Sequence, residues 1–166
     1  MDIKPRVVVI GGSGTIKDNP MLADAPWKTF RTCITSPMFS EWDGVVPYQE
    51  TDDLVFIPRH GGENGTKRYG PSKTQYLANI VAARMLGSVV IATSAVGSLQ
   101  EAIEVESLVV PTSWVDESLR NPNLWGTGII THINPRPAFS PELSRILVEE
   151  AGESFNGVHN QGTYVT

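Results

Sequence analysis

The sequence predicts an α/β fold, a three-layer sandwich with a central mixed, largely parallel sheet. Two observations carry this prediction: short uninterrupted runs of β-branched residues, typical of strands buried on both faces, and helical patterns between them. Of the 166 residues, 40% are hydrophobic and 19% charged. This composition suits one globular domain with its own core, so we expect a single domain over residues 1–166.

The strands are predicted where apolar runs end at glycine, proline or a cluster of small residues. Four such runs occur, at residues 7–10, 54–57, 88–93 and 107–110. Turn-rich stretches separate them at residues 35–47, 61–71 and 121–137. Residues 162–166 read as the start of a further strand. Since no covering helix follows that strand, we expect a sheet that is incomplete on its C-terminal side; a natural terminal strand is the alternative.

Two helices are predicted from apolar residues spaced three or four apart. Residues 71–86 carry the first pattern, and Gly87 follows as a stop signal. The second helix begins with Ser140 as its cap and Pro141 at its first position, and it ends before Gly152.

Charge and cysteine usage exclude several classes of protein. The formal net charge of −5 argues against a nucleic-acid binder. The only cysteine, Cys33, rules out an intrachain disulfide and a cysteine-rich zinc site. The three histidines show no spacing typical of metal ligands. With no signal-like apolar segment at the start and no run long enough to span a membrane, we expect a cytoplasmic protein.

Two loops that follow predicted strands are suited to an anion. Gly11-Gly12-Ser13-Gly14 offers bare backbone N–H groups and the Ser13 hydroxyl; on its own it is equally an ordinary turn. In Arg59-His60-Gly61 the guanidinium supplies a fork of donors that matches phosphate oxygens, and the imidazole adds another. Taken alone, this pair is more often a solvated loop.

The third loop, Ser94-Ala95-Val96-Gly97-Ser98, follows a third strand and is built from small residues. It leaves room for a ligand, although a tight turn without a ligand has the same composition. The coincidence of three such loops favours a site, because the carboxyl ends of parallel strands meet at one edge of the sheet.

At these loops the sequence resembles the methylthioadenosine and purine nucleoside phosphorylase family. Five stretches occur in the family's order: Val9-Ile10-Gly11-Gly12-Ser13-Gly14, Ile57-Pro58-Arg59-His60-Gly61, Pro71-Ser72-Lys73 through Tyr76-Leu77-Ala78-Asn79-Ile80, Thr93-Ser94-Ala95-Val96-Gly97-Ser98-Leu99, and Gly162-Thr163-Tyr164-Val165-Thr166. The loop at residues 62–69 departs from the family pattern.

The resemblance implies a trimeric enzyme that splits a purine nucleoside with phosphate and needs no metal or organic cofactor. By position, the phosphate-binding residues would be Ser13, Arg59, His60, Ser94 and Ala95. The nucleoside-binding residues would be Ala95, Val96, Gly97 and His132, the histidine serving a neighbouring subunit.

The resemblance also implies that the base-binding residues and the general acid belong to a later part of the family sequence. We therefore expect phosphorolysis of a 5′-methylthioadenosine-like nucleoside, with no catalytic acid assigned among residues 1–166. The alternatives are a 6-oxopurine nucleoside phosphorylase and a noncatalytic remnant that binds phosphate or nucleoside. The expected partners are phosphate, a purine nucleoside and further copies of the chain.

Overall fold

The computed structural model describes residues 6–12, 20–33, 44–61, 68–118 and 137–166. The chain divides into two compact units, Met1–Ala95 and Val96–Thr166, which are taken in turn below. In the part of the chain that is described, no helix is both long and apolar enough to cross a bilayer. The single domain expected over residues 1–166 stays a prediction.

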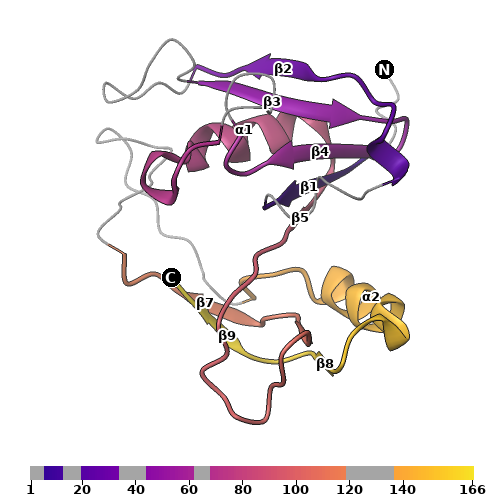
Figure 1. Ribbon diagram of the computed structural model, residues 1–166, viewed down its shortest axis with the longest axis vertical. Coiled ribbons are helices and arrows are strands. Elements are labelled where there is room, and N and C mark those ends of the chain that lie inside the picture. The colour runs from indigo at the N-terminus through magenta and orange to yellow at the C-terminus, as the bar shows by residue number, and fades with distance from the viewer. Residues whose placement is uncertain (1–5, 13–19, 34–43, 62–67, 119–136) are drawn as a thin grey trace. The chain divides into compact units, whose positions relative to one another are not determined.

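The first unit is built on a five-stranded mixed sheet (Figure 1). Its strands are β1 (Val7–Gly11), β2 (Lys28–Arg31), β3 (Val45–Glu50), β4 (Leu54–Pro58) and β5 (Val89–Ala92), in the order β2-β3-β4-β1-β5. The central strand β1 is parallel to both β4 and β5, whereas β3 is antiparallel to β4 and β2. The predicted α/β fold with a mixed sheet is confirmed.

One face of this sheet packs against helix α1 (Tyr76–Leu86). Val8 and Val55 are partners in the β1–β4 register, so their side chains lie on the same face of the sheet. The α1 residues that meet this face are small, which lets the helix approach closely. The buried cluster consists of Val8, Ile10, Val46, Val55, Ile57, Ala78, Ala82 and Ala83.

The helix predicted from Pro71 begins later than the pattern indicates. Residues Pro71–Lys73 form a separate 3-10 turn, η3, and α1 starts only at Tyr76. Between them Thr74 has extended backbone, with φ −65° and ψ 129°. The prediction was wrong there because apolar spacing does not register a single residue whose backbone leaves the helix.

The second unit contains two short parallel pairs and one helix (Figure 1). Strand β6 (Leu108–Val109) pairs with β8 (Val158–His159), and β7 (Ser113–Val115) pairs with β9 (Thr163–Val165). Helix α2 (Pro141–Ala151) begins as predicted, since the Ser140 hydroxyl accepts a hydrogen bond from the Leu143 N–H at 3.3 Å. A 3-10 turn, η4 (Gly152–Ser154), follows it. The strand expected in residues 162–166 is confirmed as β9.

Two differences from the predicted strands have a structural cause. The stretch at residues 35–47, expected to be turns, ends inside β3, because Val45 pairs with Arg31 of β2. Strand β5 was expected to be buried on both faces, yet the Val90 side chain is 40% exposed, because β5 is the edge strand of its sheet. Strands β2, β7 and β8 lie outside every predicted run.

Candidate functional site

The ends of three neighbouring parallel strands form the candidate site. Gly11 ends β1, Arg59 follows β4 and Thr93 follows β5. Two backbone hydrogen bonds continue past the strands: the Arg59 N–H donates to the Gly11 carbonyl at 2.8 Å, and the Thr93 N–H donates to the Ile10 carbonyl at 2.9 Å. The structure therefore brings together the three strand ends at which the loops singled out in the sequence begin.

The Arg59 side chain reaches across these loops. Its Nη1 donates to the Thr93 carbonyl oxygen at 2.9 Å, so the guanidinium of the β4 loop is tied to the β5 loop. A Cβ placed on Gly12 would lie 3.5 Å from Arg59 Nη2, which puts the same guanidinium beside the β1 loop. The position of Arg59 beside the ends of all three strands thus follows from the strand order β4-β1-β5.

No described carboxylate neutralises Arg59. The ion pairs among the described residues join Glu50 to Arg6 and Lys28, and Glu149 to Arg145. Arg59 instead bonds to neutral acceptors, the Thr93 carbonyl and the His60 ring. A half-buried guanidinium held by neutral partners keeps its positive charge available to an anion, which it can bind with a planar fork of N–H donors.

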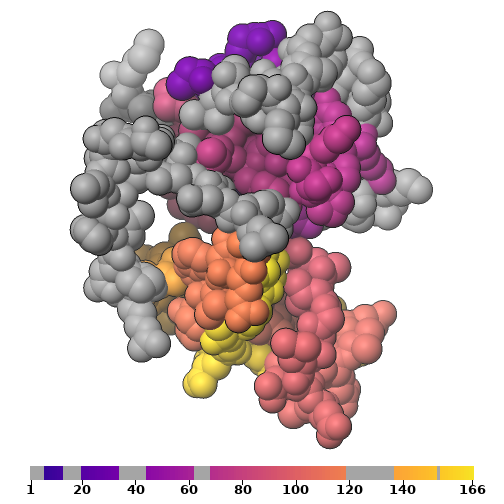
Figure 2. Space-filling view, turned by 90° about the vertical axis from the view of Figure 1, so that its left-hand side faces the viewer, coloured from indigo at the N-terminus to yellow at the C-terminus, as the bar shows by residue number. Residues whose placement is uncertain are grey.

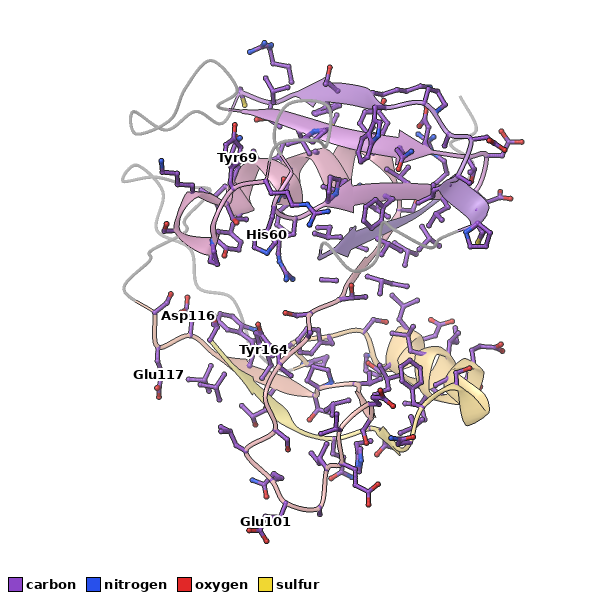
Figure 3. All side chains as sticks on the ribbon, in the orientation of Figure 1. His60, Tyr69, Glu101, Asp116, Glu117 and Tyr164 are labelled. Atoms are coloured by element: carbon purple, nitrogen blue, oxygen red, sulfur yellow. The ribbon has the colours of Figure 1, made fainter. Side chains whose placement is uncertain are left out.

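His60 is held at both ring nitrogens. Its Nε2 accepts from Arg59 Nε at 3.3 Å, and its Nδ1 lies 2.9 Å from the Thr74 hydroxyl oxygen. Figure 3 shows His60 close to Tyr69, whose N–H donates to the His60 carbonyl at 2.8 Å. Burial and the neighbouring Arg59 charge lower the pKa of His60 below its ordinary value, only partly offset by the backbone of Tyr69. The imidazole is therefore mainly neutral at pH 7.

Two buried contacts fix the backbone of the Arg59-His60 loop. The Asn79 amide on α1 donates from Nδ2 to the Arg59 carbonyl at 3.1 Å, and Asn79 is only 6% exposed. Gly61 packs against prolines: an added Cβ would lie 2.6 Å from Pro58 Cγ and 3.0 Å from Pro47 Cγ. Only glycine fits at position 61 without moving the loop.

The remaining predicted site residues are placed as follows. Ser94 and Ala95 directly follow Thr93 at the end of β5, and both are exposed. Val96 and Gly97 belong to the second unit, where both are exposed. Ser13 and His132 lie outside the described residues.

Sequence reasoning missed two residues that shape the site, Thr74 and Asn79. Both belong to the stretch of residues 71–80, which was interpreted by its apolar spacing and as a family motif, with no role given to either polar side chain. The signal that could have identified them is a polar side chain at the start of an otherwise apolar helix, where it turns toward the core.

Comparison with known proteins identifies the family of this chain. The model of the phosphorylase superfamily matches residues 6–166. Two proteins named S-methyl-5′-thioadenosine phosphorylase, from Aedes aegypti and Hyperthermus butylicus, are each 32% identical to the chain over 97% and 98% of its length. The chain spans 58% of the length of each of these relatives.

Solved structures give the same result for the fold. A methylthioadenosine phosphorylase from Schistosoma mansoni in complex with adenine superposes with a TM-score of 0.73 at 28% identity, covering 98% of this chain and 65% of the other. A methylthioadenosine phosphorylase from an antarctic soil metagenomic library gives 0.75 at 26% identity, covering 97% and 55%.

Proposed function

Because this chain belongs to the phosphorylase superfamily, we propose that the complete protein splits a 5′-methylthioadenosine-like purine nucleoside with inorganic phosphate. The products would be the free purine base and (methylthio)ribose 1-phosphate, so the enzyme would be a pentosyltransferase. The resemblance to the methylthioadenosine and purine nucleoside phosphorylases, first seen in five short motifs, is confirmed. The two named relatives support the methylthio nucleoside as substrate.

The observation that carries this proposal is the uncompensated Arg59 guanidinium where three parallel strands end. In phosphorolysis a phosphate oxygen forms a bond to the anomeric carbon of the ribose while the glycosidic C–N bond breaks. The electron pair of that bond leaves with the purine, which takes up a proton. Fixed donors that seat the anionic nucleophile supply positioning and electrostatic stabilisation.

We assign the phosphate to the cradle formed by Arg59, His60, the backbone of Ser94 and Ala95, and Ser13. The nucleoside would lie beside Ala95, Val96 and Gly97. His132 would reach the ribose bound by a neighbouring subunit, as the family resemblance implies. This last role requires an oligomer, and we propose a trimer or a multiple of one.

Phosphate is the proposed co-substrate, and the proposed reaction uses no metal or organic cofactor. Nothing in this chemistry involves a nucleic acid or a membrane. The cytoplasmic location expected from the sequence stays a prediction.

The test is release of free purine by the purified complete protein, measured by chromatography with 5′-methylthioadenosine and with inosine. We expect cleavage of 5′-methylthioadenosine only when phosphate is present. Faster cleavage of inosine would point to the 6-oxopurine alternative. A folded protein that binds phosphate but releases no base from either nucleoside would be the noncatalytic remnant, and the proposed activity would be wrong.

A further inference from the structure

We infer that Thr74 is a positioning residue of the candidate phosphate site: it holds His60 in the tautomer that braces Arg59. The inference rests on the proposed function as far as phosphate is concerned, whereas the tautomer of His60 can be measured without it. Thr74 belongs to none of the groups assigned to the ligand above, and it acts only through His60.

The hydrogen bonds that link Arg59, His60 and Thr74 each have one possible direction, because the donor and acceptor groups determine it. Arg59 Nε can only donate, so His60 Nε2, at 3.3 Å, must accept and carries no proton. A neutral imidazole then has its proton on Nδ1, which donates to the Thr74 hydroxyl oxygen at 2.9 Å. The hydroxyl proton of Thr74 is in turn directed to the Gly70 carbonyl at 3.4 Å.

The local backbone explains why Thr74 is available for this role. Thr74 lies between η3 and α1 in extended conformation, and α1 has no side-chain hydrogen bond at its N-cap, Gln75. The Thr74 hydroxyl therefore does not cap the helix. Thr74 is 6% exposed, so water competes little for its hydroxyl, and a lost partner would leave a polar group buried and unpaired.

This arrangement specifies what His60 does in the proposed cradle before phosphate binds: it positions the Arg59 guanidinium. With Nε2 engaged by Arg59 and Nδ1 by Thr74, neither ring nitrogen faces an empty position among the described residues. What His60 contributes is a fixed guanidinium: Nε is turned toward the imidazole and one Nη1 proton toward Thr93. The other three N–H donors of the guanidinium, one on Nη1 and two on Nη2, are left for phosphate.

The first measurement is the tautomer of His60 in the complete protein without phosphate, from the ¹⁵N chemical shifts of the ring, assigned by their loss in His60→Gln. We expect a protonated Nδ1 and an unprotonated Nε2. In Thr74→Val the acceptor for Nδ1 is lost, so the ring should shift toward the Nε2-protonated tautomer, whose N–H opposes that of Arg59. Thr74→Ser, which keeps the hydroxyl, should restore the wild-type spectrum.

The second measurement is calorimetric titration with inorganic phosphate. Thr74→Val should weaken binding about 3- to 10-fold, the loss of roughly one hydrogen bond, and Thr74→Ser should recover most of it. The KM for phosphate should rise by the same factor while the KM for the nucleoside stays unchanged. The matched control is Thr32→Val. Thr32 is also buried, and its hydroxyl donates to the Gly44 carbonyl at 3.0 Å, but it directly follows β2, the edge strand that is not part of the candidate site.

A wild-type His60 protonated on Nε2 would overturn the inference, and this measurement needs no variant, so it decides even if Thr74→Val is unstable. An unchanged tautomer in a folded Thr74→Val variant would overturn it as well. A shifted tautomer with unchanged phosphate affinity would also overturn it. If the wild-type protein binds no phosphate at all, the proposed function is wrong, and the link between Thr74 and His60 is still decided by the ring spectra.

Discussion

At the scale of single residues, Arg59 differs from the other paired cations of the described structure in the kind of partner it has. Arg6 and Lys28 share the Glu50 carboxylate, and that pairing lowers the pKa of Glu50, with the Lys28 hydrogen bond as the largest cause. Arg59 has a carbonyl and an imidazole instead. An ion pair with a carboxylate neutralises the cation. Hydrogen bonds to neutral acceptors orient the guanidinium and leave its positive charge available to an anion.

We therefore expect Arg59→Ala to weaken phosphate binding by roughly 1.5–3 kcal/mol, the range for hydrogen bonds to charged groups. Calorimetric titration with inorganic phosphate measures this directly. Arg84→Ala is the control. Arg84 is exposed in the last turn of α1, so its substitution removes the same charge at a position outside the candidate site. Equal affinity of the Arg59→Ala variant and the wild type would mean that Arg59 is an ordinary surface residue.

Arg59 and His60 could be singled out from the sequence because they directly follow a buried strand, but taken alone the pair favoured a solvated loop, and the phosphate role came from the family resemblance. Thr74 and Asn79 could not be predicted in the same way. Their partners lie 14 and 20 residues away in sequence, and the contacts exist only because α1 packs beside β4. A role that depends on such packing leaves no pattern in the local sequence.

At the scale of elements, the predicted strands are those whose residues carry their own signal. β1 and β4 are uninterrupted apolar runs with fully buried valines, and α2 has both a capping serine and a proline at its first position. β2 is a mixture of charged and aromatic residues with mostly exposed side chains, and it becomes a strand by pairing with β3. β8 has two residues and is defined entirely by its pairing with β6.

The junction of α1 and β5 shows how an element boundary can be right for a different physical reason. Gly87 was expected as a stop signal for the helix, where a left-handed backbone favours glycine. Its φ is −159°, an extended conformation that any residue adopts. Glycine is needed because β1 passes so close: an added Cβ would lie 2.6 Å from Val8 Cγ2 and 2.7 Å from the Arg6 carbonyl oxygen.

Gly87→Ala should accordingly destabilise the protein by about 1–3 kcal/mol, the usual cost of overpacking. The Arg6 carbonyl also accepts from the Ser88 N–H at 3.0 Å, so the backbone there cannot shift without weakening the start of β5. Urea denaturation gives the change in free energy of unfolding. Gly70→Ala is the matched control, since nothing lies within 4 Å of its added Cβ and its φ of −62° suits alanine. Equal costs at both positions would contradict the steric explanation.

At the scale of the whole molecule, the two units differ in how completely they bury their apolar residues. The first unit has a sheet whose central residues Val8, Val55 and Ile57 are fully buried. In the second unit large apolar side chains are exposed on the segment before β6, which is drawn in Figure 2, and on the β7–β9 pair, where Trp114 lies opposite Tyr164. The exposed apolar residues of this unit are Val96, Leu99, Val105, Trp114, Val115, Phe139, Ile146, Phe155, Tyr164 and Val165.

Exposed apolar residues in such numbers are typical of surfaces that other protein covers, because leaving them in water has a free-energy cost that grows with their area. Trp and Tyr are also the residue types enriched at subunit interfaces. Together with the neighbouring-subunit role that the family resemblance implies for His132, this predicts that the complete protein is an oligomer. Light scattering coupled to size-exclusion chromatography should give a particle mass of three chains or a multiple of three. A stable, folded monomer at micromolar concentration would contradict the prediction and would also remove the proposed role of His132 in a neighbouring site.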